Sequence, residues 1–364
     1  MGHLKKALVF YLYSNNNAGD MAICMGAIDF LKSAGFEITF VSRYSDRNEE
    51  FLDSARYVHK YHPDIKIESG VFTFNRSSSY VAKLAAYAHG FVRYVLPIRD
   101  KRLEELIRET DVVFFNGGNL LRCDGFADIS RLYALFYPLQ IAKKIGKPLI
   151  CLPQSTANVS RLGKTILERC ISLFDLVAIR ESLSYKAIKV LFPNIPCAQS
   201  IDLAFFIEKL DSDTSFMQFN NRVALVLRES GIGDIGNLED RRIAEMSKGI
   251  VDFVERHPDE RFVIVVQTKK DRDYSYRMLK EIDSSRIDII EEHDPIRLVS
   301  LYEQCKALIT MRPHAGILAI RAGTPVIGFF DPSWGLKNKG IMCDFRMGYA
   351  ENPSALDDQY AITL

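Results

Sequence analysis

The sequence predicts two α/β domains, each built on a parallel β-sheet, which face each other across a cleft. Short apolar runs alternate with amphipathic stretches along almost the whole chain, a pattern typical of βαβ units. The length of 364 residues corresponds to about two domains of ordinary size. A polar stretch without periodicity, 208–221, separates the two series. We therefore expect an N-terminal domain at 1–207, a linker at 208–221 and a C-terminal domain at 222–364.

Each domain contains five apolar runs of strand length. In the first domain the expected strands are 7–13, 38–41, 112–115, 149–152 and 176–179, and in the second 223–227, 262–266, 287–290, 307–310 and 326–329. Helical periodicity predicts helices at 21–34, 103–109, 131–145, 164–172, 184–191, 241–256, 295–304 and 317–322. Because ligands of such folds bind at the carboxyl ends of the strands, polar residues directly after a strand are the candidate site residues.

The composition excludes several classes of protein. With 47 basic and 46 acidic side chains, the chain has no global excess of positive charge, so no nucleic-acid partner is expected. An apolar content of 48% is ample for a core and excludes a disordered chain. The seven cysteines are scattered without a C-x-x-C pair, which favours free thiols and a cytoplasmic protein. No apolar stretch approaches the roughly 18 residues of a membrane span.

The loop after the first expected strand carries Asn17, Gly19 and Asp20. Glycine permits unusual backbone angles, and the helix that follows offers free N–H groups to an anion or to substrate hydroxyls. The same residues would equally suit a capped turn in which Asp20 caps the helix. Both interpretations stay open, and in the first of them Asp20 is also a candidate general base.

Further hydroxyl-binding side chains follow the next strands of the first domain. The strand 112–115 is followed by Asn116, Gly117, Gly118 and Asn119, and the strand 149–152 by Gln154. Two glycines let a ligand approach the backbone, while amides can bind hydroxyls. Three such strand ends in one sheet favour a sugar-like ligand in the first domain.

Arg180 ends another strand of the first domain. It is a candidate contact to the acceptor, but a structural salt bridge to Glu181 or Asp202 is at least as well supported by the sequence.

The second domain has a cationic constellation. Arg228 follows the strand 223–227, and Arg312 and His314 follow the strand 307–310 immediately before an apolar helix. Arginine binds carboxylate or phosphate bidentately, and histidine can transfer a proton near neutral pH. A lone histidine is most often a core residue, but its two arginine neighbours favour a functional His314. This is the expected site for an anionic ligand.

Other motifs point to no second chemistry. The G-x-G-x-x-G pattern at 231–236 lacks the acidic residue that a dinucleotide site needs after the next strand, so NAD is rejected. No metal signature is present, and neither a metal nor a cofactor is expected. Lys337 and Lys339 could supply a mobile cation but are expected to be solvated. The helical stretch 77–102 is expected to pack on its own domain, with at most peripheral membrane contact.

Taken in order, these motifs resemble the polysaccharide pyruvyl transferase family. They are N-x-A-G-D, N-G-G-N-L, Q-S, A-I-R-E-S-x-S, the strand-capping Arg228, and R-P-H-A-G-I-L-A-I-x-A-G-T-P-V-I-G, and they extend over about 7–345. The resemblance implies a glycosyltransferase-B-like fold and transfer of pyruvate from phosphoenolpyruvate to a saccharide as a ketal, in surface or exopolysaccharide biosynthesis. It implies that Arg228 and Arg312 hold the donor and that His314 is the general acid. The family commonly has an aliphatic residue where this chain has Pro313, which has no N–H to offer a phosphate.

The first domain would then bind the saccharide acceptor, free or lipid-linked, and the second the phosphoenolpyruvate co-substrate. Two alternatives remain at this point. One is a glycosyltransferase-B-type enzyme that uses a nucleotide sugar, and the other is a non-catalytic saccharide-binding member of the family.

Overall fold

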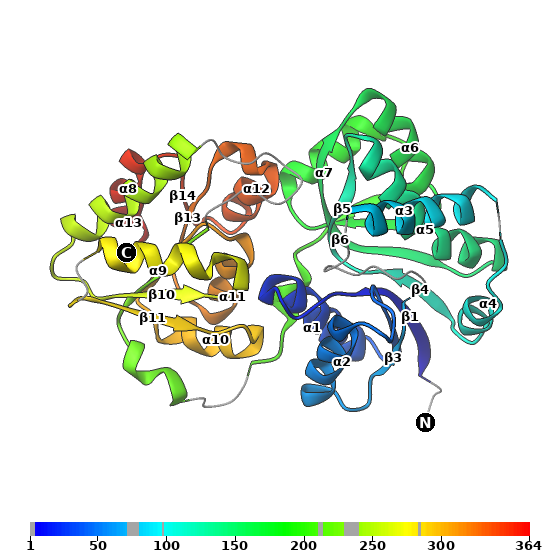
Figure 1. Cartoon of the computed structure of the whole chain (residues 1–364), viewed down its shortest axis with the longest axis horizontal. Coiled ribbons are helices and arrows are strands. Elements are labelled where there is room, and N and C mark those ends of the chain that lie inside the picture. The colour runs from blue at the N-terminus through cyan, green and yellow to red at the C-terminus, as the bar shows by residue number, and fades with distance from the viewer. Residues whose placement is uncertain (1–3, 71–79, 97, 210–213, 229–239, 283–284) are drawn as a thin grey trace. The chain divides into compact units, whose positions relative to one another are not determined.

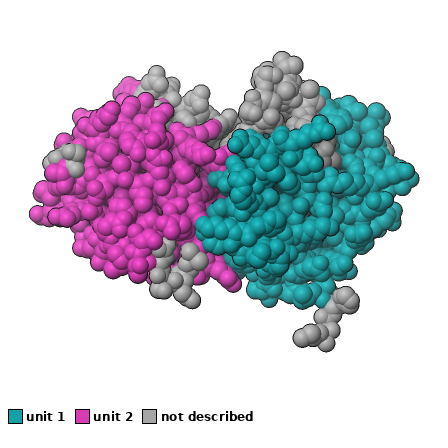
Figure 2. Space-filling model, turned by 60° about the horizontal axis from the view of Figure 1, so that its bottom comes forward, with its two compact units in different colours: residues 1–15, 23–206 teal, residues 16–22, 207–364 magenta. Residues whose placement is uncertain are grey.

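The chain folds into two compact units. The computed structural model describes residues 4–70, 80–96, 98–209, 214–228, 240–282 and 285–364. Unit 1 comprises Met1–Asn15 and Ile23–Phe206, and unit 2 comprises Asn16–Ala22 and Ile207–Leu364 (Figure 2). The segment 208–221, predicted as a linker, falls in unit 2, where its described part includes the 3-10 helix η2 (Thr214–Phe219). Phe216 and Phe219 of η2 are buried.

Unit 1 is built on a parallel sheet in the order β3-β2-β1-β4-β6-β7-β8, with β5 also beside β6. Figure 1 labels β1, β3, β4, β5 and β6 of this sheet. Its strands are β1 (Lys5–Leu12), β2 (Phe36–Ser42), β3 (Lys66–Glu68), β4 (Val112–Phe115), β5 (Gly118–Cys123), β6 (Leu149–Val159), β7 (Leu176–Ile179) and β8 (Cys197–Gln199). All four residues of β4 are buried, as expected for an apolar strand in the middle of a sheet covered on both faces.

The helices of unit 1 connect these parallel strands. They are α1 (Ala18–Ser33), whose first residues belong to unit 2, α2 (Glu49–Tyr61), α3 (Tyr80–Val95), α4 (Lys101–Arg108), α5 (Phe126–Ile145), α6 (Arg161–Ile171), α7 (Ser182–Leu191) and the 3-10 helix η1 (Leu203–Phe206). Helix α5 packs against α3, α4 and α6, and together they form one helical layer.

Unit 2 has a parallel sheet in the order β11-β10-β9-β12-β13-β14. Its strands are β9 (Val223–Val226), β10 (Phe262–Val266), β11 (Ile287–Glu291), β12 (Ala307–Thr310), β13 (Val326–Phe329) and β14 (Gly348–Ala350). The strand order reverses between β10-β9 and β12-β13, which makes the carboxyl ends of β9 and β12 the topological switch point.

The helices of unit 2 form two layers. They are α8 (Asp240–Arg256), α9 (Arg272–Glu281), α10 (Pro295–Gln304), α11 (Pro313–Ala322), α12 (Leu336–Asp344) and α13 (Leu356–Thr363), with 3-10 helices η3 (Lys269–Asp271), η4 (Pro332–Trp334) and η5 (Pro353–Ala355). Helix α8 packs against α9 and α13, whereas α11 packs against α10 and α12.

The predicted class, two α/β domains on parallel sheets, is confirmed. Some local expectations were wrong, two of them in the elements themselves. Residues 118–119, expected in a loop, begin β5, which pairs with the long strand β6. Helix α1 starts at Ala18 rather than at residue 21, because the Asn17 side chain caps it by accepting a hydrogen bond from the Gly19 N–H at 3.1 Å. In the part of the chain that the structure describes, no helix combines the length and the apolar character that crossing a membrane requires.

Candidate active site

The sheet register of unit 2 places Arg228 and Arg312 at the same edge. Val226 at the end of β9 pairs with Thr310 at the end of β12. Arg228 and Arg312 each lie two residues beyond this pair, and the Met311 N–H donates to the Val226 carbonyl at 2.8 Å. Neighbouring strands lie about 4.8 Å apart, so the two arginines start from adjacent positions at the switch point. The structure thus brings together the two cations that the sequence predicted.

Arg312 is held in place by a carboxylate and a hydroxyl. Its Nε donates to Oδ2 of Asp271, whose side chain is 5% exposed. The Thr310 hydroxyl accepts from the Arg312 N–H and donates to the Arg312 carbonyl, both at 2.9 Å. Asp271 closes η3 after β10, and sequence reasoning missed it as a partner of Arg312. The guanidinium is therefore oriented before any ligand binds.

Arg228 is a buried cation with another cation nearby. It is 4% exposed, and its guanidinium lies 4.7 Å from the centre of the Trp334 ring. Burial, together with the charge of Arg312, lowers the pKa of Arg228 to about 9, although Asp271 acts in the opposite direction. A bound anion would stabilise the charged form of a guanidinium in such surroundings, because burial and a neighbouring cation both disfavour that charge.

His314 lies in the first turn of α11, against Gly19. A Cβ atom on Gly19 would lie 2.7 Å from Cγ and 2.8 Å from Cβ of His314, so only glycine leaves room for the imidazole. Both residues belong to unit 2. Asn17 of the same segment forms an isolated antiparallel bridge with Thr268 after β10. A predicted acceptor-side segment and the predicted general acid thus lie together in unit 2.

Asp20 is the third residue of α1 and half-buried. The expectation that it caps the helix is wrong, because Asn17 fills that role. The Asp20 carboxylate therefore does not cap the helix. That this segment contacts an anion or substrate hydroxyls, with Asp20 as the candidate general base, remains a prediction.

Pro313 occupies the first position of α11. Proline is well accommodated there, because the first N–H of a helix has no intrahelical acceptor. The N-cap residue Arg312 makes no side-chain capping bond. Because Pro313 has no N–H, only the backbone N–H groups of the residues after it in the first turn of α11 can bind an anion.

Two of the predicted acceptor amides of unit 1 are bound to backbone groups. Gln154, predicted to follow a strand, lies inside β6, because that strand continues to Val159. Asn116 and Gln154 are fully buried, and Nε2 of Gln154 donates to the Asn116 carbonyl at 2.5 Å. Asn116 Nδ2 donates to the Tyr11 carbonyl at 3.0 Å, and Gln154 Oε1 accepts from the Leu120 N–H at 2.9 Å. These two side chains shape the edge of the sheet, and their contact with an acceptor stays a prediction.

The structure explains why the two residues after Asn116 are glycines. A Cβ on Gly117 would lie 2.8 Å from the Pro153 carbonyl oxygen, and Gly118 has φ of +142°, which disfavours other residues. Asn119 differs from its neighbours, since its Oδ1 is buried without a hydrogen-bond partner. Of the predicted acceptor residues after β4, Asn119 is thus the one with an unused polar atom.

Arg180 forms the structural salt bridge that the sequence left open, with Asp202 rather than Glu181. Nη1 of Arg180 lies 2.5 Å from Oδ2 of Asp202, and both side chains are 1% exposed. Arg180 Nε also donates to Ser155 Oγ at 2.7 Å. Glu181 instead caps α7 by accepting from the Ser184 N–H at 2.8 Å. Contact between Arg180 and a saccharide would require this buried pair to open.

Three residues after β13 are buried, which the sequence did not predict, and one of them contacts Arg228. Trp334 is fully buried under Arg228, Lys337 is 7% exposed and Asn338 is 1% exposed. The expectation that Lys337 is solvated was wrong, whereas Lys339 is half exposed and pairs with Glu351 at 3.2 Å. The glycine pattern at 231–236 lies outside the described residues.

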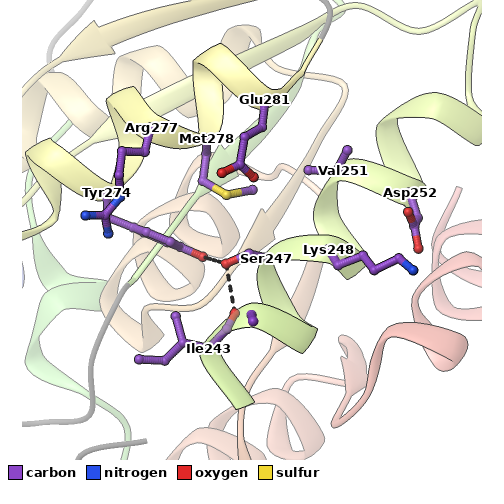
Figure 3. A pocket seen from close by; sticks show the side chains of 10 residues that line it. Ile243, Ser247, Lys248, Val251, Asp252, Tyr274, Arg277, Met278 and Glu281 are labelled. Atoms are coloured by element: carbon purple, nitrogen blue, oxygen red, sulfur yellow. Dashed lines mark hydrogen bonds between the residues drawn. The ribbon is translucent and has the colours of Figure 1, made fainter. Parts of the chain in front are cut away.

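A cavity of about 500 Å³ lies elsewhere on unit 2, between α8 and α9 (Figure 3). Ser247 and Tyr274 hydrogen bond across it at 2.7 Å, and Lys248, Asp252, Arg277 and Glu281 surround it. None of the predicted site residues lines it. Among the residues that the structure describes, no cluster of three or more histidine, cysteine or acidic side chains could hold a metal ion.

Solved structures with a similar fold define the class of the protein. The chain matches a UDP-GlcNAc 2-epimerase from Methanocaldococcus jannaschii, solved with UDP-GlcNAc and UDP (TM-score 0.57, 12% identity, 99% of this chain and 93% of that chain). It also matches a UDP-GlcNAc 2-epimerase from Neisseria meningitidis (0.56, 14%, 99% and 93%) and UGT73P12 from Glycyrrhiza uralensis (0.58, 9%, 99% and 87%). At these identities the likeness concerns the fold alone, which is of the glycosyltransferase-B kind.

The sequence gives a narrower assignment within this class. Residues 17–330 match the family model described as polysaccharide pyruvyl transferase, and the chain belongs to that family. The protein is accordingly a transferase. No match was found among curated proteins. The matched range contains Asn17, Arg228, Arg312 and His314, but ends before Trp334 and Asn338.

Proposed function

We propose that this protein transfers pyruvate from phosphoenolpyruvate to hydroxyl groups of a saccharide, forming a ketal, in the biosynthesis of a surface or exopolysaccharide. The observation that carries the proposal is the arrangement at the switch point of unit 2. Arg228 and Arg312 extend from adjacent strand ends there, and His314 lies in the first turn of α11, which begins directly after Arg312. Phosphoenolpyruvate carries a carboxylate and a phosphate on one carbon, and two adjacent guanidinium groups match that arrangement.

The chemistry requires an acid near neutral pH. His314 donates a proton to the methylene carbon of phosphoenolpyruvate, which leaves an oxocarbenium-like centre at the carbon bearing the phosphate. A saccharide hydroxyl attacks that carbon and loses its proton, for which Asp20 is the candidate base. The bond between that carbon and the phosphate oxygen then breaks. A second hydroxyl attacks the same carbon and passes its proton to the departing phosphate, so that the products are the ketal and hydrogen phosphate. Arg228 and Arg312 stabilise the charge on the departing phosphate.

The acceptor side of the proposal is a saccharide, free or carried on a lipid. Asn119 supports it, because its buried Oδ1 has no partner and could accept a hydrogen bond from a sugar hydroxyl. The seven cysteines are free thiols, which supports a cytoplasmic site of action.

The test is release of inorganic phosphate from phosphoenolpyruvate in the presence of candidate glycans, followed by detection of the ketal. His314→Gln keeps a polar side chain of similar reach but cannot donate the proton, so kcat should fall by at least about 100-fold. His257→Gln is the matched control, because His257 hydrogen bonds to the Phe253 carbonyl at the end of α8. Turnover of His314→Gln within a few-fold of the wild type would exclude His314 as the acid.

A second arm separates the proposal from the other functions that the fold supports. Binding is measured with phosphoenolpyruvate and with a panel of nucleotide sugars. Binding of a nucleotide sugar but not of phosphoenolpyruvate would indicate a glycosyltransferase. Saccharide binding that is unchanged by Arg228→Ala, without turnover of any donor, would indicate a non-catalytic member.

A further inference from the structure

Two buried polar side chains after β13 have atoms without a hydrogen-bond partner. Nε1 of Trp334 and both amide atoms of Asn338, Nδ2 and Oδ1, have no partner in the described structure. Trp334 is 0% exposed and Asn338 is 1% exposed. A buried polar atom left without a partner costs about 1–3 kcal/mol, so native proteins normally satisfy it. Three such atoms within five residues therefore indicate a place that a polar ligand completes.

The fold places the Trp334 ring next to the cationic edge, and Asn338 follows four residues later. Strand β13 pairs with β12 in parallel, with Gly328 opposite Thr310. The residues that follow β13 therefore emerge at the same edge as Arg228 and Arg312. Direct contact supports this, because the Arg228 guanidinium lies 4.7 Å from the centre of the Trp334 ring. Asn338 is in the first turn of α12, whose N-cap residue is Gly335 and therefore offers no side chain to cap the helix.

The start of the segment that carries Trp334 and Asn338 is held by hydrogen bonds to Arg242 of α8. Asp331 pairs with Arg242 Nε at 2.6 Å and accepts from the Ser333 N–H at 2.9 Å. Burial alone would raise the pKa of Asp331, but these hydrogen bonds lower it overall. Arg242 Nη2 also donates to the Glu351 carbonyl at 2.7 Å. The turn that leads to Trp334 and Asn338 is therefore held in place by its contacts with Arg242.

The donor and acceptor atoms of this pair match a phosphate group. The indole N–H and the Asn338 amide N–H can each donate to a phosphate oxygen, while Oδ1 can accept from the hydroxyl of hydrogen phosphate. Both side chains are uncharged. They can therefore add hydrogen bonds beside Arg228 without adding to the repulsion that Arg228 already experiences from Arg312.

We propose that Trp334 and Asn338 form a neutral phosphate-binding wall beside Arg228, which holds the phosphate of the donor before transfer and the hydrogen phosphate released afterwards. This rests on the proposed function, since the phosphate is that of phosphoenolpyruvate. It assigns the phosphate, rather than the carboxylate, to the side of the site that faces β13.

The experiment is calorimetric titration with phosphoenolpyruvate and with inorganic phosphate, combined with thermal unfolding of the unliganded protein. In Asn338→Leu the buried amide is replaced by an apolar group of similar size. The unliganded protein should become more stable, and the Kd for both ligands should rise about tenfold or more. In the transfer reaction the loss should fall mainly on KM for phosphoenolpyruvate.

Two further variants keep the test decisive if Asn338→Leu does not fold. Trp334→Phe removes the indole N–H but keeps a ring under Arg228, and should also raise both Kd values. Asn338→Asp places a carboxylate at the wall and should weaken phosphate most. The matched control is Ser300→Ala, because Ser300 Oγ is likewise buried without a partner but belongs to α10. This control should leave both Kd values unchanged.

The outcomes distinguish this inference from the proposed function. A wild-type protein that binds neither phosphoenolpyruvate nor phosphate would overturn both. Wild-type binding with unchanged Kd values in Asn338→Leu and Trp334→Phe would overturn the phosphate wall alone. A loss confined to phosphoenolpyruvate, with phosphate binding unchanged, would also overturn it, because Asn338 would then contact the carboxylate.

Discussion

The guanidinium of Arg228 stacks over the ring of Trp334, 4.7 Å from its centre, while its own surroundings disfavour its charge. A cation–π contact contributes about 2 kcal/mol or more when desolvated, but the pKa of Arg228 is still lowered overall, so the stacking does not fully offset burial. In the function proposed above, Arg228 serves ligand binding at some cost to the stability of the unliganded fold.

Arg228→Met should separate these two effects. The thioether side chain removes the buried charge and its repulsion with Arg312 but can still pack on Trp334. We expect the free energy of unfolding of the unliganded protein to rise by about 1–3 kcal/mol, while phosphoenolpyruvate binding is lost. Denaturant unfolding and calorimetry measure the two quantities. A variant that is less stable than the wild type would show that Arg228 stabilises the fold.

Gly19→Ala should damage catalysis more than folding. The added methyl group would lie 2.7 Å from Cγ of His314, so the imidazole must turn or shift. We expect kcat for pyruvyl transfer to fall at least about tenfold, since a misplaced proton donor loses its alignment. Gly125→Ala is the matched control, because a Cβ there meets nothing within 4 Å and activity should be unchanged. Normal kcat in Gly19→Ala would show that the contact does not position His314.

The Arg180–Asp202 pair should prove structural. Asp202→Asn leaves a buried guanidinium without its counter-charge, and we expect a loss of about 3–5 kcal/mol in unfolding free energy. Replacing both partners by Arg180→Met and Asp202→Leu should recover most of that stability. Activity that returns with stability in the double variant would support a structural role. A stable double variant without activity would instead support the contact between Arg180 and the acceptor.

Much of the fold follows from local sequence pattern. The strands 112–115, 262–266, 307–310 and 326–329 were predicted with the bounds of β4, β10, β12 and β13, because each is a continuous apolar run. Helix α9 was missed, since its sequence RDYSYRMLKE is largely polar and buries few side chains. After residue 340 the short strand β14 and helix α13 carry too weak a pattern to be predicted.

The cations of the site were predictable, and their surroundings were not. Arg228 and Arg312 stand out in the sequence because a charge directly follows an apolar strand. Asp271 pairs with Arg312 from 41 residues away, and no local pattern encodes that pairing. The burial of Asn338 likewise depends on how α12 packs against α11 and β13. A helix whose apolar positions are so unevenly spaced does not show its buried face in the sequence.

The pairing of Val226 with Thr310 has a consequence for how this site can change. The hydrogen-bond ladder of the sheet fixes the spacing of the two backbone positions from which Arg228 and Arg312 extend. Substitutions in the surrounding loops can change the neighbours of these side chains, but they leave the backbone spacing unchanged. A different spacing would need a shifted strand, and a shift by one residue would turn every core side chain of that strand outward.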